Sequence, residues 1–284
     1  MAGEANKKSD ERSDDDVVAR GGAIPSIARM FQYIAESTDG SGHFVGIARD
    51  GTAYTWGRTG SLGRLGRDGR ARTPAPVSLE DPEVNGSGGG KRARAVRAFA
   101  GGTKESGHTA VLDREGYLWV AGCDRWQQLG LGSHEAGAAG YTWTAVWQER
   151  FVRNDHLARL IRVKCGGFIR DVALGGDHTV VLSSNKRDVY AFGKGGEGQL
   201  GLSGKLFVST PAWSKKLSSR NGDSDGDIAA VCAIQHCSLA LSDSGDVLRK
   251  VGKCRMMANG MAEALKACQD RANRDGLTST QRKN

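Results

Sequence analysis

The chain repeats one short pattern four times, and this repetition limits its fold more than any other feature. In three copies a histidine is followed by an apolar run, a polar turn and a second apolar run that ends in glycine. The histidine and glycine are 14, 14 and 15 residues apart, and in the fourth copy a cysteine stands 15 residues before the glycine. The four pairs are His43 and Gly57, His108 and Gly122, His178 and Gly193, and Cys237 and Gly252.

Each copy has the sequence of a β-hairpin. Residues 179–182 and 188–192 have the composition of strands, rich in β-branched and aromatic residues. In the turns of the first two copies, Gly51 and Gly116 tolerate the positive backbone angle that hairpins need. A sheet of this size cannot bury both of its faces alone, so the sequence predicts a row of small sheets that stack on one another.

The repeat resembles that of the regulator of chromosome condensation family. The matching features are the turn 175–179 (GGDHT), the strand ends at Gly57 and Gly193, and the Gln-Leu-Gly step that ends at Gly201. Leu-Gly steps follow the first two copies as well, at 65–66 and 129–130. The resemblance covers residues 28–253 and implies a β-propeller.

Propellers of this family usually have about seven blades, whereas the anchor positions here, spaced 65, 70 and 59 residues apart, mark four. We therefore expect an all-β fold, a partial or reduced β-propeller of about four blades, with a C-terminal α-helix. An open arc would leave strand edges and an apolar face for other chains to cover. Four-bladed rings also exist, so closure stays an alternative.

The domain boundaries follow from where the repeats begin and end. Residues 1–22 are expected to form a disordered tail, 23–253 the repeat domain, and 254–284 a helix and basic tail. Three segments lengthen the spacing between copies and are interpreted as insertions: 85–94, 133–158 and 214–227.

Composition indicates an intracellular protein without a membrane span. No run of about 18 apolar residues is present, and the first residues lack the apolar core of a signal peptide. The six cysteines form no CxxC pair and are interpreted as reduced thiols. We expect a cytoplasmic or nuclear location, with mitochondria as an open alternative.

The net charge of +8 is concentrated in two regions, residues 57–97 and 249–284. In the first region, Lys91, Arg92 and Arg94 close a glycine-rich loop. They are either solvated or in contact with an anionic partner, such as a nucleic acid or an acidic protein.

Two apolar stripes are candidate partner contacts. Trp143, Trp147 and Phe151 are four residues apart, a spacing that would gather three rings on one face of a helix. The rings would pack on their own blade or bind a partner. After Gly252, a helical stripe of Met257, Met261, Leu265 and Cys268 would cap the last blade or dock on another protein.

The residues do not indicate an enzyme, a cofactor or a metal site. His43, His108 and His178 recur at equivalent positions, so we interpret each as a structural group that bonds backbone in its own blade turn. The run 223–227 (DSDGD) is similar to a calcium loop but has Ile234 where the bidentate glutamate belongs.

Three functions agree with this sequence. The leading hypothesis is a non-catalytic interaction or scaffold subunit of a larger assembly, whose partners are other protein subunits. The family resemblance implies a second, a guanine-nucleotide exchange factor or regulator of a small GTPase. A third is an RNA- or chromatin-associated subunit that uses the basic segments.

Overall fold

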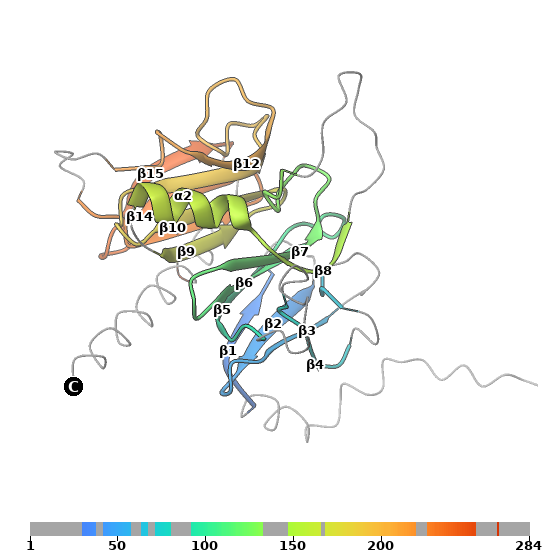
Figure 1. Cartoon of the computed structure of the whole chain (residues 1–284). Coiled ribbons are helices and arrows are strands. Elements are labelled where there is room, and N and C mark those ends of the chain that lie inside the picture. The colour runs from blue at the N-terminus through green and yellow to red at the C-terminus, as the bar shows by residue number, and fades with distance from the viewer. Residues whose placement is uncertain are drawn as a thin grey trace, which may run out of the picture.

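In the computed structural model, four antiparallel sheets follow one another along the chain (Figure 1). The structure describes residues 30–37, 42–57, 64–67, 72–80, 92–132, 147–165, 168–219, 226–253 and 266. We call the sheets the first to the fourth blade. The blades contain β1 (Phe31–Glu36), β2 (His43–Ala48), β3 (Ala53–Gly57) and β4 (Ala75–Pro76); β5 (Ala95–Gly101), β6 (His108–Asp113), β7 (Leu118–Cys123) and β8 (Trp147–Arg153); β9 (Ile169–Leu174), β10 (His178–Ser183), β11 (Val189–Lys194) and β12 (Phe207–Trp213); and β13 (Ala230–Ile234), β14 (Cys237–Leu241) and β15 (Val247–Gly252).

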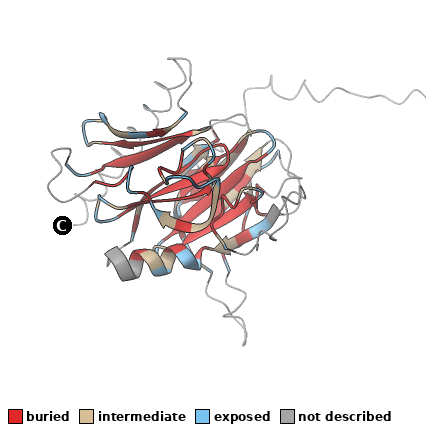
Figure 2. Ribbon diagram, turned by 90° about the horizontal axis from the view of Figure 1, so that it is seen from above, coloured by how far each residue is buried: buried red, intermediate tan, exposed pale blue. Residues whose placement is uncertain are grey.

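The blades stack face to face, as the repeat pattern predicts. One apolar cluster fills each seam between neighbours, and Val45 and Ile47 of the first seam are completely buried. The inner strands β1, β5, β9 and β13 contact one another in that order. Among the described residues no comparable contact joins β13 to β1, so these blades form an arc of a propeller. Figure 2 shows the buried strands running through the middle of the molecule, with exposed turns at the ends of the sheets.

The histidine and glycine anchors are register partners within each blade. His43 pairs with Gly57, and the three later pairs found in the sequence stand opposite each other in the same way. All four glycines have a positive φ, between 90° and 137°. A Cβ on Gly193 would lie 2.6 Å from the Asp177 carbonyl oxygen and 2.8 Å from the His178 Cα. Glycine is needed here because the two chains approach too closely for any side chain.

One helix, α2 (Asp155–Cys165), follows β8 and covers the seam between the second and third blades. Asn154 caps it: its Oδ1 accepts from the Leu157 N–H at 2.9 Å, and its Nδ2 donates to the Leu129 carbonyl at 2.8 Å. Leu157 and Ile161 on its inner side are buried in the seam.

The expected aromatic helix around residues 143–151 is wrong for the part that the structure describes. Trp147 and Phe151 belong to β8, which pairs with β7 and completes the second blade. Phe151 is buried and packs in the seam with the first blade, so its ring is not available to a partner. A spacing of four residues between aromatic side chains does not predict a helix here, because hydrogen bonding of β8 to β7 determines the conformation of this segment. Trp143 lies outside the described residues.

The C-terminal stripe of Met257, Met261 and Leu265 also lies outside the described residues, and its helix stays a prediction. No helix in the described part of the chain is both long and apolar enough to cross a membrane.

Replacing Gly193 by alanine should lower the free energy of unfolding by about 2 kcal/mol or more, because the new Cβ meets backbone on two sides. Gly204→Ala is the matched control: its φ is also positive, at 68°, but no atom lies within 4 Å of the added Cβ. The free energy of unfolding of that variant should fall by only about 1 kcal/mol. Chemical denaturation measures both, and equal losses would contradict the close approach.

Candidate functional site

A buried histidine joins each blade to the next. The Nε2 atom of His43 lies 2.8 Å from the Thr109 hydroxyl of the second blade. His108 meets Thr179 of the third blade at 3.3 Å, and His178 meets Ser238 of the fourth at 2.8 Å. Each bond therefore crosses a seam to a side-chain hydroxyl and does not go to backbone in the histidine's own blade turn, as its repeated position predicts.

Each receiving hydroxyl also has a second partner, the backbone of the preceding blade. Thr109, Thr179 and Ser238 donate to the carbonyls of Arg64, Gln128 and Gln199, at 2.5, 2.8 and 2.8 Å. Since the hydroxyl proton is used by the carbonyl, the oxygen accepts the histidine Nε2–H. This fixes the tautomer of the ring in all three seams.

Burial keeps these imidazoles neutral. Loss of solvation lowers the pKa of His43 and His178 to about 3 and that of His108 to about 4. The nearby Arg64 guanidinium lowers the pKa of His43 further. The rings are therefore uncharged hydrogen-bond donors and are not poised for acid–base chemistry at neutral pH.

The seam chemistry stops at both ends of the arc. Thr109, Thr179 and Ser238 each come directly after the anchor position of their blade, and the same position in the first blade is Phe44. The first blade therefore has no hydroxyl to receive a histidine. The fourth blade has Cys237 at the anchor, so it has no imidazole to donate.

Phe44 belongs to a layer of side chains on the outer face of the first blade, the face turned away from the second. Register places Phe44 opposite Trp56 and Ile34 beside Tyr54, with Gly46 between them. This surface, which we call the first-blade flank, consists of Phe31, Ile34, Phe44, Tyr54 and Trp56, and the exposed Glu36, opposite Phe44 in the register, lies at its edge.

The rings of the first-blade flank are packed against one another. Phe44 and Trp56 stack with centroids 5.5 Å apart, and Phe31 stacks on the other side of Trp56 at 5.3 Å. Tyr54 meets Phe31 edge-on at 5.3 Å. Gly46 makes room, since a Cβ there would lie 3.0 Å from Phe31 and 3.1 Å from Trp56. The layer is thus a preformed, rigid surface.

This surface is only partly covered. Phe44, Tyr54 and Trp56 are half-buried and Ile34 is 40% exposed, whereas Val45 on the opposite face of the same strand is fully buried. An apolar sheet face that remains open to solvent indicates a contact surface.

The outer face of the fourth blade differs, because its apolar side chains are fully buried. They are Cys232, Ile234, Cys237, Leu239 and Leu241. Cys237 is disulfide-bonded, while Cys123 and Cys232 are free thiols. The interpretation of all six cysteines as reduced is therefore wrong for Cys237.

The two described cations of the predicted basic loop make contacts within the chain. Arg92 donates to the Val77 carbonyl at 2.8 Å, and Arg94 donates to the Asp50 carbonyl in the turn of the first blade. Both side chains are still exposed. Lys91 lies outside the described residues.

No group of three or more metal-ligating side chains gathers among the residues that the structure describes.

Two buried groups near the second seam have pKa values well above their usual range. Burial raises the pKa of the Asp124 carboxyl to about 7 and that of the Cys123 thiol to about 11. Asp124 holds its loop by accepting the Leu129 N–H at 2.9 Å.

Comparison with known proteins agrees with the repeat. A family model described as "Regulator of chromosome condensation (RCC1) repeat" matches residues 169–199, in the third blade. The chain is 29% identical over 223 residues to the human E3 ubiquitin-protein ligase HERC2, covering 78% of this chain and 4% of the ligase. It is also 29% identical to the zebrafish (Danio rerio) Protein RCC2 homolog, covering 75% of this chain and 41% of that protein.

Solved structures share the fold. The structure of yeast RCC1 (Prp20) bound to Kap60 matches with a TM-score of 0.53 and 18% identity, over 76% of this chain and 42% of that one. The chain thus spans less than half the length of each of these three relatives.

The first-blade flank was missed by sequence analysis, although a signal was present. The residue after the anchor reads Phe, Thr, Thr and Ser through the four copies. Phe44 is the one aromatic residue at a position that otherwise holds a hydroxyl side chain, and this difference indicates that the outer face of the first blade has another role.

Acid should destabilise the protein through the seams. An unfolded histidine takes a proton below about pH 6.5, whereas these rings stay neutral when folded. The unfolded state then binds more protons, so the free energy of unfolding falls with falling pH by about 1.4 kcal/mol per pH unit for each histidine. The pKa of Asp124 is raised in the folded protein, so its contribution to the free energy of unfolding grows as the pH falls and offsets the contribution of one of the three histidines.

Denaturant titrations between pH 6 and pH 5 measure the net loss of unfolding free energy. His178→Gln should remove one histidine's share, and an unchanged slope would contradict the neutral seam.

Proposed function

Because this chain is a β-propeller protein built from regulator of chromosome condensation repeats, we propose that it is a non-catalytic interaction subunit that binds a protein partner through the first-blade flank. The observation that carries this proposal is Phe44, which replaces the seam hydroxyl and joins a stacked, half-exposed aromatic layer.

The other blades support the use of this face for binding. In the second, third and fourth blades, the equivalent face is covered by the preceding sheet. Its apolar side chains exclude water there and supply the main favourable energy of each seam. The same kind of face in the first blade leaves apolar side chains open to solvent, where a partner could cover them.

The chemistry of Phe44 favours a surface other than another histidine-type blade. A preceding blade of that type would bury a histidine Nε2–H against the phenyl ring, without its hydroxyl acceptor. An unsatisfied buried donor costs about 1–3 kcal/mol. The expected partner therefore presents an apolar sheet or helix face, into which the aromatic rings fit as binding hot spots.

A charge placed in this surface tests the proposal. The full chain is tagged and purified from its own cells as the wild type and as Ile34→Glu, and co-purifying proteins are quantified. Ile34→Glu should reduce the main partner at least about tenfold, because a carboxylate would be buried in an apolar contact.

Leu206→Glu is the matched control, since Leu206 is 61% exposed on a loop of the third blade. It should retain the partner. Circular dichroism must show that both variants are folded. Equal partner recovery from Ile34→Glu and wild type would overturn the proposal.

The GTPase and nucleic-acid hypotheses are distinguished by separate assays. Faster nucleotide release from a small GTPase, unchanged by Ile34→Glu, would favour the family's regulatory activity over the flank as the functional surface. Binding of RNA that weakens steeply with salt and with charge reversal at Arg92 and Arg94 would favour the nucleic-acid reading.

A further inference from the structure

The outer face of the fourth blade is buried although no described sheet lies beyond it. Each of its apolar side chains is at most 2% exposed: Cys232, Ile234, Cys237, Leu239 and Leu241. Among the described elements, the main contacts of β13 and β14 are with each other, with β15 and with the third blade on the seam side. Another part of the chain therefore covers this face, which we call the fourth-blade flank.

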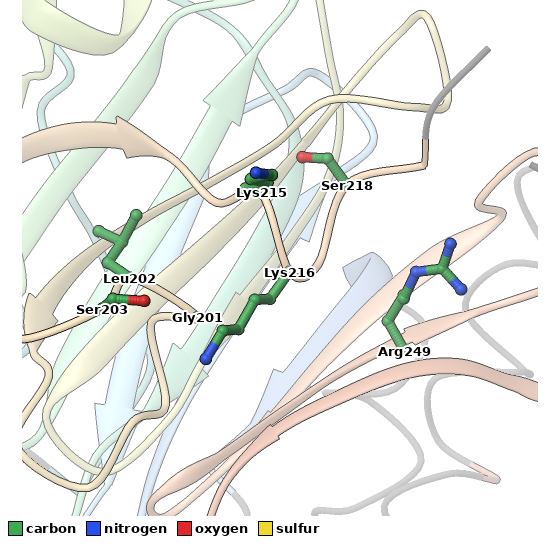
Figure 3. A pocket seen from close by; sticks show the side chains of 7 residues that line it. All are labelled: Gly201, Leu202, Ser203, Lys215, Lys216, Ser218 and Arg249. Carbon is green, nitrogen blue, oxygen red and sulfur yellow. The ribbon is translucent and has the colours of Figure 1, made fainter.

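The cover lies over β13 and β14 and leaves the outer face of β15 open. Arg249 of β15 pairs with Ala240 of the seam cluster and lines a pocket at the seam with Lys216 of the third blade (Figure 3). Lys250 pairs with Leu239 of the fourth-blade flank, yet it is exposed. The buried strip is thus two strands wide, or about 10 Å, which is also about the diameter of one α-helix.

The disulfide of Cys237 identifies the covering segment. Two of the other cysteines are thiols in the structure, namely Cys123 and Cys232. Three cysteines remain as possible partners: Cys165, Cys254 and Cys268.

Cys165 is too far from this face to be the partner. It ends α2, which covers the seam between the second and third blades, so the third and fourth sheets both separate it from the fourth-blade flank. Packed sheets are about 10 Å apart, whereas the Cα atoms of a disulfide are at most about 7 Å apart. The two remaining cysteines both belong to residues 254–284, and no other segment outside the described residues contains a cysteine.

Residues 257–268 have the pattern and length of a helix that fits the buried strip. The apolar stripe consists of Met257, Met261, Leu265 and Cys268. A helix over this range is about 17 Å long, and the five-residue strands β13 and β14 are also about 17 Å long. Lys266, which lies off the stripe, is helical and exposed.

We propose that residues 254–268 dock on the fourth-blade flank as an amphipathic helix, which a disulfide to Cys237 holds in place. β15 ends at Gly252, the register partner of Cys237, so the chain leaves the sheet beside the cysteine that is linked. A helix that starts there reaches β14 without a long connection. This C-terminal cap covers the last described blade with the chain's own residues, and it does not depend on a partner at the first-blade flank.

Peptide mapping of the full chain, purified without reductant, tests the covalent link. Mass spectrometry of the digest should find Cys237 joined to Cys254 or Cys268. The same digest after reduction is the control, because the joined peptides then separate. A link to Cys165, or Cys237 recovered as a thiol, would overturn the proposal.

Cys232 reports on the docking of the helix, because it is a buried thiol of the fourth-blade flank. In a full chain with Cys237→Ser, only apolar contact holds the helix. Adding Met261→Glu should make alkylation of Cys232 at least about tenfold faster, because a carboxylate in an apolar contact favours the open form. Cys123, buried at the end of β7, should react at an unchanged rate.

Asn259→Glu in the same Cys237→Ser chain is the matched control, because it adds the same charge about 160° away around the helix. It should leave the alkylation rate of Cys232 unchanged. Equal rates in the Met261→Glu and Asn259→Glu chains would overturn the proposal. Circular dichroism and the Cys123 rate must show intact sheets. If Met261→Glu fails this check, Met261→Gln is compared with Asn259→Gln in its place.

Discussion

The arc depends on one interaction, the hydrogen bond from a buried imidazole to a hydroxyl on the next blade. A small sheet has two apolar faces and must cover both, but apolar contact alone does not fix how far one sheet slides on another. The His–hydroxyl–carbonyl chain fixes it, because each hydroxyl must lie at hydrogen-bond distance from both the imidazole and the carbonyl of the preceding blade. Burial makes this stringent, since an unpaired polar group in the seam is costly.

The two ends of the arc meet this requirement differently. Phe44 removes the acceptor from the first blade and builds an aromatic surface in its place. Cys237 removes the donor from the fourth blade, whose outer face is buried.

The sequence predicted the architecture well, because the repeat anchors record strict geometric demands. His43 with Gly57 and the later pairs can be identified from the similarity of the four segments, because only glycine fits opposite each anchor and it therefore recurs at a near-constant distance. The aromatic helix failed because Trp147 and Phe151 also suit a strand, and pairing with β7 was invisible in the sequence. The first-blade flank brings together residues distant in the chain, such as Ile34 with Tyr54, which spacing does not reveal.

Adjacent strand residues point to opposite faces of a sheet. The dipeptides His108-Thr109 and His178-Thr179 therefore carry the donor for the following blade and the acceptor for the preceding one. A duplicated repeat would therefore carry both the donor and the acceptor, and a deleted repeat would remove both. Gene rearrangement can accordingly change the number of blades without redesigning any junction, while one substitution in the dipeptide, as at Phe44, removes the acceptor that a histidine of a preceding blade would need.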